Sequence, residues 1–380
     1  MPFSSLGLSK PLLKAVAEQN YTQLYPIQQQ AIPAILQGKD ILGIAKTGSG
    51  KTASFVLPIL ELFHRTTGVH TKSVSVLVLV PTRELAVQVA DVFQDFSAHL
   101  PDKVKTVAVY GGVSINPQMI AVHGADIVVA TPGRLLDLVA QRALHLSKVE
   151  ILVLDEADKM LDLGFADEMN QVFDLLPDKR QTLLFSATLG DAVQDINASL
   201  LHDPVKIEIV EEAQNIELIK QLAYRVDPER KGPLLRYLIK SGKMKQVLVF
   251  VSSTRTADNL VVKLNKNGIQ AAAIHSGKTQ GARTDALTKF KAGKLGVLVA
   301  TDLISRGIDI QLLPHVINFE LPRSPKDYIH RIGRTGRAEA EGEAISLICP
   351  DDEHHFKIIQ KKMGKRVDII DTEGLDLAGY

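Results

Sequence analysis

Ala45-Lys-Thr-Gly-Ser-Gly-Lys-Thr52 is the stretch that decides the fold of this chain. It follows a short apolar run at 40–45, typical of a buried strand, and precedes 53–60, typical of the start of a helix. A glycine-rich turn in that place lets backbone N–H groups point at a phosphate, and the helix N-terminus adds positive potential. In such a loop Lys51 reaches the β- and γ-phosphates and the Thr52 hydroxyl ligates Mg²⁺. The stretch favours a nucleotide site over an ordinary turn.

Length and composition bound the class of protein. A chain of 380 residues predicts two or three domains of roughly 150 residues each. The formal net charge is only +1, so any nucleic-acid contact must come from local placement of charge. The single Cys349 excludes an intrachain disulfide and a cysteine-based zinc site, which suits a reducing cytosol. No signal-peptide pattern and no membrane-spanning apolar run are present, so we expect a cytoplasmic protein that does not contact membranes.

Apolar, β-branched-rich runs recur between helical patterns in both halves of the chain. Such runs predict parallel sheets covered by helices on both faces. An acidic segment without strong periodicity lies between the two series. We therefore expect an N-terminal α/β domain at 1–207, a linker at 208–219 and a C-terminal α/β domain at 220–380. The predicted strands are 41–45, 74–80, 104–109, 127–130, 151–154 and 182–185 in the first half, and 247–251, 269–274, 297–300, 316–319 and 344–348 in the second.

Residues ahead of the glycine-rich stretch are suited to bind the adenine base of a nucleotide. The Gln28 amide offers a donor and an acceptor, which match one edge of adenine. Tyr21 offers a face for stacking. Alone, the two residues would indicate only a surface helix and a turn, and they become informative because the phosphate loop follows them.

Three loops after predicted strands suit a phosphodiester backbone. Residues 81–86, Gly111-Gly112 and 131–134 follow strands, and ligand contacts in doubly wound sheets lie at the carboxyl ends of strands. Their glycine N–H groups and the side chains of Arg83 and Arg134 are donors for phosphate. Each loop alone would favour plain turn chemistry.

Asp155-Glu-Ala-Asp158 ends the apolar strand 151–154. An acidic strand end in a nucleotide domain is a Walker-B arrangement, in which Asp155 holds Mg²⁺ through water and Glu156 polarises the attacking water. The alternative, an acidic helix N-cap, does not explain two acids directly after four apolar residues. Ser186 and Thr188 follow the next strand and offer hydroxyls to Asp158, which would couple the metal site to movement elsewhere.

In the second half, His330-Arg-Ile-Gly-Arg-Thr-Gly-Arg337 brings three arginines together. The spacing of Arg334 and Arg337 places both on one helix face or loop edge, which suits arginine fingers for a γ-phosphate. The alternative is a solvated basic face. With the phosphate loop in the other domain, fingers here imply that hydrolysis needs a closed interdomain cleft.

With these motifs in this order, essentially the whole chain resembles the DEAD-box RNA helicases, and within them the bacterial RhlE-type proteins. The most specific stretches are 155–165 and Gly111-Gly-Val-Ser-Ile-Asn-Pro-Gln118. The resemblance implies two RecA-like domains, each a mostly parallel sheet with helices on both faces, in the P-loop NTPase, superfamily 2 helicase core. It also implies an RNA-dependent ATPase with ATP and Mg²⁺ as cofactors and RNA as partner.

Residue roles follow from the resemblance motif by motif. ATP would be bound by Phe3, Tyr21, Gln28, Ala45, Lys46, Thr47, Gly48, Ser49, Gly50, Lys51, Thr52, Gly307 and Asp309, and the metal by Thr52 and Asp155. Lys51, Asp155, Glu156, Arg334 and Arg337 would be catalytic, and Asp158, Ser186, Thr188 and His330 would couple the sites. RNA would contact Pro81, Thr82, Arg83, Gly111, Gly112, Thr131, Gly133 and Arg134 in the first domain, and Thr254, Gln280, Arg283, Thr301 and Asp302 in the second.

The chain departs from the family pattern at a few positions. Ala45 replaces the first glycine of the phosphate loop, Asn20 replaces a glycine, and Leu24-Tyr25 replaces the common Pro-Thr. Ser276 replaces the usual Gly after His275, and 303–305 differ from the commoner small residues before Arg306. None removes a catalytic group.

We therefore expect a monomeric helicase that couples ATP hydrolysis to local unwinding of short RNA duplexes with weak sequence preference. The resemblance implies ribosome assembly or RNA turnover, with proteins of those processes as partners. The alternatives are an ATP-gated RNA clamp or assembly scaffold with little unwinding, and a DNA translocase of the same architecture.

Overall fold

The computed structural model describes residues 2–19, 21, 23–45, 48–65, 73–209, 219–302, 313–335 and 342–380. The chain divides into two compact units, Met1–Glu211 and Glu212–Tyr380. The predicted linker 208–219 falls mostly outside the described residues: strand β7 (Val205–Glu208) ends at its first residue and β8 (Ile219–Arg225) begins at its last. Those domain limits stay a prediction. In the described parts of the chain, no helix is both long enough and apolar enough to cross a membrane.

The first unit is a seven-stranded parallel sheet with the strand order β3-β4-β2-β5-β6-β1-β7. Its strands besides β7 are β1 (Ile41–Ile44), β2 (Val76–Leu79), β3 (Thr106–Val109), β4 (Ile127–Ala130), β5 (Ile151–Leu154) and β6 (Gln181–Ser186). Its helices are η1 (Phe3–Leu6), α1 (Lys10–Glu18), α2 (Pro26–Leu36), α3 (Lys51–Arg65), α4 (Arg83–Ser97), α5 (Asn116–Ala121), α6 (Pro132–Ala140), α7 (Ala157–Asp162), α8 (Ala166–Phe173) and α9 (Asp191–Leu200).

Both faces of this sheet are buried, as the apolar runs predict. Alternate residues of β2 enter different clusters: Val76 and Val78 pack with α1 to α4, whereas Leu77 and Leu79 pack with α6 to α9. Since side chains alternate across a strand, helices on both faces require apolar residues at every position.

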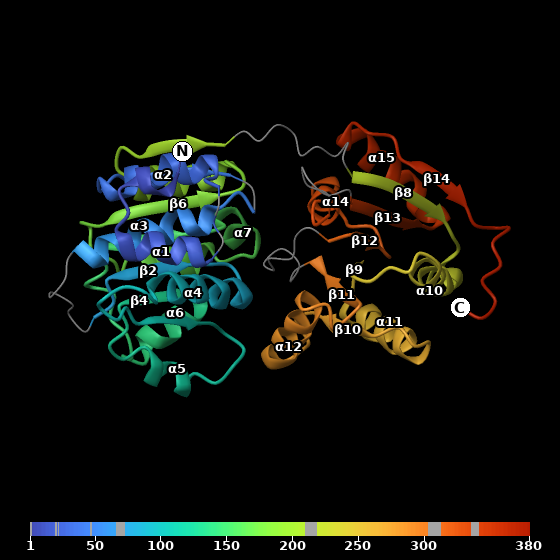
Figure 1. Cartoon of the computed structure of the whole chain (residues 1–380), viewed down its shortest axis with the longest axis horizontal. Helices are drawn as coiled ribbons and strands as arrows, with labels where there is room; N and C mark the ends of the chain where they lie inside the picture. Colours follow the sequence, from blue (N-terminus) through green and yellow to red (C-terminus); the bar gives the residue numbers. More distant parts are fainter. Residues whose placement is uncertain are drawn as a thin grey trace. The chain divides into compact units, whose positions relative to one another are not determined.

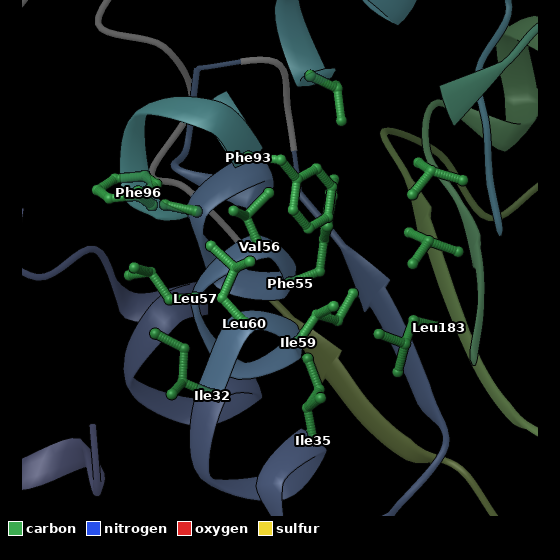
Figure 2. Packing of buried hydrophobic residues seen from close by; sticks show 14 of the residues in the cluster. Ile32, Ile35, Phe55, Val56, Leu57, Ile59, Leu60, Phe93, Phe96 and Leu183 are labelled. Atoms are coloured by element: carbon green, nitrogen blue, oxygen red, sulfur yellow. The ribbon is translucent and has the colours of Figure 1, made fainter. Parts of the chain in front are cut away.

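Helix α3 is the centre of the first of these layers. Its Phe55 ring lies 5.5 Å from the ring of Phe185 in β6 and 6.4 Å from that of Phe93 in α4, measured between centroids. Figure 2 shows side chains of α2 and α4 gathered around α3. The helix that begins at Lys51 is therefore anchored along its length, which fixes the loop in front of it.

The second unit is also a seven-stranded parallel sheet, in the order β10-β11-β9-β12-β13-β8-β14. Its strands besides β8 are β9 (Val247–Val251), β10 (Ala271–Ile274), β11 (Val297–Thr301), β12 (His315–Asn318), β13 (Gly342–Ile348) and β14 (Asp368–Asp371). Its helices are η3 (Pro228–Arg230), α10 (Lys231–Ser241), α11 (Thr254–Lys266), α12 (Gln280–Lys291), α14 (Pro325–Ile332), η4 (Pro350–Asp352) and α15 (Glu353–Met363).

Helices α10 and α11 cover one face of this second sheet, and α12, α14 and α15 cover the other. Every predicted strand is present in the two sheets (Figure 1), and the predicted fold is confirmed. Strands β7, β8 and β14 were not predicted. Strands β7 and β14 are mostly exposed edge strands, and β8 alternates buried with exposed residues, so none carries a continuous apolar run.

Candidate functional site

The carboxyl ends of the first sheet carry the predicted motifs in two adjoining groups. The phosphate loop follows β1, Ser186 ends β6 with Thr188 just beyond it, and Asp155–Asp158 follows β5, and these three strands are neighbours. The loops at 81–86, 131–134 and 111–112 follow β2, β4 and β3, the next three strands along the same edge. Because strands lie about 4.8 Å apart, motifs scattered over 140 positions form one continuous edge.

The phosphate loop has the backbone that its glycines allow. Gly48 and Gly50 both have φ of 87°, the left-handed region that glycine tolerates without cost. Lys51 begins α3, and its buried ammonium donates a 2.8 Å hydrogen bond to the Ala45 carbonyl. The backbone N–H of Ala45 donates to the Ser186 carbonyl over 3.0 Å and joins the start of the loop to the end of β6; this bond does not depend on which side chain stands at position 45. Ser49 is buried and Thr52 lies half-buried in the first turn of α3; the predicted residues Lys46 and Thr47 lie outside the described residues.

Gln28 is buried and ties α2 to the phosphate loop. Its Oε1 accepts from Tyr25 N over 3.0 Å, and its Nε2 donates to the Gly50 carbonyl over 3.1 Å. A Cβ on Gly50 would lie 2.5 Å from that Nε2 atom, so the contact requires glycine. Tyr21 packs edge-to-face between Phe3 and Phe96, with ring centroids 6.3 and 5.4 Å away. Phe3 and Tyr21 thus pack together, and Gln28 holds the phosphate loop, a role that the sequence did not indicate.

Asp155 is a buried carboxylate at the end of β5. Burial raises its pKa to about 6, the charge of Glu156 also raises it, and the ammonium groups of Lys51 and Lys159 oppose both effects. Its Oδ1 atom is buried and has no hydrogen-bond partner among the described residues. A buried, unpaired carboxylate oxygen beside the phosphate loop suits a cation. Mg²⁺ usually takes one or two protein carboxylates together with substrate phosphates, so a single carboxylate here is enough to contribute to such a site.

Glu156 has a strained backbone and a fixed side chain. Its φ of 55° and ψ of 47° lie in the left-handed region, where a non-glycine residue costs roughly 1–2 kcal/mol. Its Oε1 atom forms a 2.6 Å ion pair with the ammonium of Lys159, and both side chains are nearly buried. Strain of this kind concentrates at functional sites. Lys159 was not identified from the sequence, although its i,i+3 spacing from Glu156 was a usable signal.

The predicted link between Asp158 and the loop after β6 is present. Thr188 Oγ1 donates to Asp158 Oδ2 over 2.9 Å, and Lys159 N donates to Asp158 Oδ1 over 3.0 Å. The Ser186 hydroxyl instead donates to the Thr188 carbonyl over 2.8 Å, so it orients Thr188.

The predicted RNA loops of the first unit combine rigid support with open glycines. Added Cβ atoms on Gly111 and Gly133 would meet nothing within 4 Å, whereas one on Gly112, whose φ is 77°, would lie 2.2 Å from Arg83 Nη1. Thr82 caps α4 by accepting from Leu85 N. Pro81 and Thr131 are buried at the starts of their loops.

Arg134 and Gln118 hold the loop after β3. Arg134 Nη2 donates to the Val113 carbonyl over 2.9 Å, while its Nη1 is buried with no hydrogen-bond partner in the described part of the chain. Gln118, the last residue of the quoted stretch 111–118, exchanges hydrogen bonds of 2.9 and 3.2 Å with the backbone of Tyr110, a role that the sequence did not indicate. A buried, unsatisfied guanidinium donor at this edge suits an incoming anion.

In the second unit, the predicted RNA residues again follow three neighbouring strands, β10, β11 and β9. Gln280 and Arg283 begin α12 and pair with each other, Arg283 Nη2 donating to Gln280 Oε1 over 2.9 Å. Thr254 is exposed at the start of α11. Thr301 ends β11, and Asp302 follows it.

Arg331 organises this edge of the second unit, a role that the sequence did not indicate. Its guanidinium forms a bidentate pair with Asp302, at 2.6 and 2.7 Å, and donates to Asn318 Oδ1 over 3.0 Å. It also stands 5.0 Å from the ring centroid of Phe250. Asp302 therefore has a structural partner in addition to its predicted RNA contact.

The remaining predicted residues are placed only in part. His330 lies half-buried in α14. That helix ends at Ile332, so Arg334 lies in the turn beyond it rather than on a helix face. Gly307, Asp309 and Arg337 lie outside the described residues.

The two parallel sheets, the phosphate loop and the acidic strand end define a two-unit nucleotide-binding α/β protein. Residues 25–196 match the family model for DEAD/DEAH box helicases, and 230–339 match that for the helicase conserved C-terminal domain. The chain is 40% identical over 367 residues to the ATP-dependent RNA helicase CshA of Listeria monocytogenes, covering 96% of this chain and 69% of that protein. It is 39% identical over 377 residues to the DEAD-box ATP-dependent RNA helicase CshA of Bacillus cereus, covering 99% of this chain and 71% of that protein.

A solved structure of S. cerevisiae Dbp5, bound to RNA and ADP–BeF3, is similar with a TM-score of 0.84 and 31% identity, covering 100% of this chain and 97% of that one. The chain belongs to the DEAD-box ATP-dependent RNA helicase family. The likeness to RhlE-type members in particular stays a prediction.

Proposed function

We propose that this chain hydrolyses ATP when RNA is bound and uses the cycle to separate short RNA duplexes. The observation that carries the proposal is the strand order of the first unit. The loops predicted for ATP follow β1, β6 and β5, and the loops predicted for RNA follow β2, β4 and β3, directly beside them. Residues that respond to one ligand therefore adjoin residues that contact the other.

In this proposal, the phosphate loop and Lys51 bind the phosphates of ATP. Lys51 would exchange its bond to the Ala45 carbonyl for phosphate oxygens. Glu156 accepts the proton of the attacking water, and the ion pair with Lys159 keeps its carboxylate in position. Asp155 and Thr52 would hold Mg²⁺, which when bound offsets the negative charge of the phosphates.

RNA, in the same proposal, contacts the open glycines and the arginines of the neighbouring loops. The hydrogen bond from Thr188 to Asp158 joins the loop after β6 to the acidic loop after β5, so it links elements within the ATP group. If ATP and RNA favour the same arrangement of these loops, each raises the affinity for the other by the same factor. The finger role of Arg334 stays a prediction.

The steady-state rate of ATP hydrolysis, measured without polymer, with single-stranded RNA and with DNA of the same sequence, tests the proposal. We expect stimulation by RNA but not by DNA, because contacts to 2′-hydroxyls distinguish the two. Glu156→Gln is the control, and its stimulated rate should fall to the background. Equal rates in all three conditions would contradict an RNA-coupled enzyme. If RNA does stimulate hydrolysis, a strand-separation assay on a short duplex distinguishes unwinding from ATP-gated clamping.

A further inference from the structure

Five exposed lysines lie at the amino-terminal edge of three neighbouring strands in the second unit. Lys243 and Lys245 precede β9, Lys294 precedes β11, and Lys266 and Lys291 are the last residues of α11 and α12. We call these five residues the lysine edge. They lie at the opposite end of the strands from the predicted RNA residues Thr254, Gln280 and Thr301, so the function proposed above makes no use of them.

The sheet topology brings these lysines together. Strands β10, β11 and β9 are adjacent, and their amino ends are joined by hydrogen bonds from Val247 N to the Gly296 carbonyl, 2.9 Å, and from Val297 N to the Gln270 carbonyl, 3.1 Å. The loops in front of them therefore lie within roughly 10 Å of one another. Helices α11 and α12 pack on opposite faces of these strands (Figure 1). Helix α11 leads into β10 and α12 leads into β11, so both end at the amino-terminal edge of the strands.

The lysine edge is a local excess of charge in a nearly neutral chain. Lysine and arginine number 44 and aspartate and glutamate 43, yet segments 240–247, 259–270 and 286–297 contain no acidic residue. The nearest acid in sequence to Lys291, Asp285, pairs with Lys289 over 2.7 Å. None of the five lysines forms an ion pair with another residue that the structure describes.

Helix stabilisation explains only part of this arrangement. Lysines in the last turn of a helix offset its dipole, which accounts for Lys266 and Lys291. Lys243, Lys245 and Lys294 lie in loops. Lys243 moreover has φ of 49°, in the left-handed region where glycine or asparagine is usual, so a lysine there strains the backbone.

We propose that the lysine edge binds the phosphate backbone of RNA that extends beyond the predicted RNA loops. Lysine ammonium groups are point charges suited to phosphates, and they supply affinity without sequence preference. In segments 240–247, 259–270 and 286–297, all of which the structure describes, Val262 is the one exposed large apolar side chain. These segments therefore lack the apolar centre that is typical of a protein interface. The inference rests on the proposed function and adds a second RNA surface to it.

The two edges are separated by the length of the strands. Strands of four or five residues, at about 3.3 Å per residue, put the edges roughly 15 Å apart. An RNA that only just covers the predicted loops has no free nucleotides to span this distance, whereas a longer RNA does. The dependence of binding on RNA length therefore separates the two surfaces.

The test is a triple variant, Lys245→Gln with Lys291→Gln and Lys294→Gln, in equilibrium binding to single-stranded RNAs of about 10 and about 30 nucleotides. We expect affinity for the long RNA to fall several-fold and the slope of log K against log salt to weaken by about 2, since each single-strand phosphate contact contributes about 0.7. Affinity for the short RNA and the basal rate of ATP hydrolysis should not change. Unchanged binding of the long RNA by the triple variant would overturn the proposal. That is the result expected if the partner of the lysine edge were an acidic protein.

The matched control replaces three exposed lysines of α15, Lys357→Gln, Lys361→Gln and Lys362→Gln, with the same loss of charge. Helix α15 packs on β8 and β13, away from the lysine edge. The control should bind the long RNA as the wild type does. An equal loss in the control would mean a general effect of net charge and would also overturn the proposal.

Lys243→Gly separates charge from folding. Glycine accepts φ of 49° without strain, so the thermal unfolding midpoint should stay or rise while affinity for the long RNA falls. Unchanged affinity would count against the lysine edge. One outcome separates the two proposals. If RNA does not stimulate ATP hydrolysis by the wild type, and the triple variant binds the long RNA more weakly than the wild type does, the proposed function fails and the lysine edge stands.

Discussion

Thr188 Oγ1 donates a hydrogen bond of 2.9 Å to Asp158 Oδ2. The two residues follow neighbouring strands, β6 and β5, and the loop of Asp158 also carries Asp155 and Glu156. This bond is a side-chain link between a loop beside the phosphate loop and the acidic loop of the site. Loss of this hydrogen bond should change the stimulation of ATP hydrolysis by RNA more than the stability of the first unit.

Replacing Thr188 by valine tests that link. Valine keeps the shape of threonine and removes the hydroxyl, so we expect ATP affinity to change little while stimulation of hydrolysis by RNA falls. The measurement is the rate of ATP hydrolysis as a function of RNA concentration. Thr188→Ser restores a hydroxyl and should restore stimulation; if serine behaves like valine, the hydrogen bond is not the link.

Asp155→Asn should stabilise the first unit in the absence of nucleotide and metal. The pKa of Asp155 is about 6 in the folded protein, against 3.8 for an ordinary aspartate, so the folded state disfavours the charged form. The resulting penalty is complete above pH 6, shrinks as the pH falls and is absent below pH 3.8. At pH 7 it corresponds to up to about 3 kcal/mol.

Urea unfolding of wild type and Asp155→Asn in chelator, at several pH values, measures this difference. The variant should be more stable above pH 6, and the two curves should converge towards pH 4. Asp158→Asn is the matched control, since both oxygens of Asp158 accept hydrogen bonds and it should gain no stability. A destabilised Asp155→Asn variant would contradict the account of its burial.

The sequence predicted the interior of the fold well, because buried parallel strands need apolar residues at every position. It could not predict strand order. Strands β5 and β6 come late in the first unit yet insert between β2 and β1, and only that insertion places Asp155 beside the phosphate loop. Local patterns do not encode which strands pair across 100 residues.

Partners within the site were also hidden from sequence reasoning. Gln28 binds the Gly50 carbonyl, and Arg331 binds Asp302, across 22 and 29 positions. Gln28 and Asp302 were each predicted to contact a ligand, and each also has a partner within the protein. Lys159 is different, because its spacing from Glu156 made the ion pair predictable.

Replacing either of two glycines at the predicted RNA edge by alanine should lower the affinity for RNA without lowering the stability of the fold. Gly111 and Gly133 have open space where a Cβ would lie, so alanine there costs the fold little. A methyl group would occupy room that a phosphate backbone needs, and we expect RNA affinity to fall roughly 10-fold, or 1.4 kcal/mol. RNA titration and thermal unfolding of Gly111→Ala and Gly133→Ala measure the two effects.

Gly112→Ala is the contrasting variant. Its φ of 77° and the nearby Arg83 guanidinium predict a loss of stability, roughly 1–2 kcal/mol from the backbone alone. If Gly111→Ala and Gly133→Ala bind RNA as tightly as the wild type, the edge formed by β3 and β4 does not carry the RNA.

Lys159→Met should slow hydrolysis by loosening Glu156. The ion pair of 2.6 Å holds a carboxylate whose backbone is already strained, and without it the carboxylate samples other rotamers. We expect kcat with RNA to fall roughly 10-fold, a part of the 10²–10⁴-fold that a positioned base contributes. KM for ATP should change little, because Lys159 lies on α7 rather than on the phosphate loop.

Lys159→Arg keeps the positive charge and should recover most of the rate. If Lys159 only filled space, methionine would support the same rate as lysine. Combining Lys159→Met with Glu156→Gln tests whether Lys159 acts only through Glu156. If Lys159 acts through Glu156, its loss should cost nothing more once the base is gone, since residues that act as a unit are not additive. An additive loss in the double variant would show that Lys159 acts on the reaction by another route.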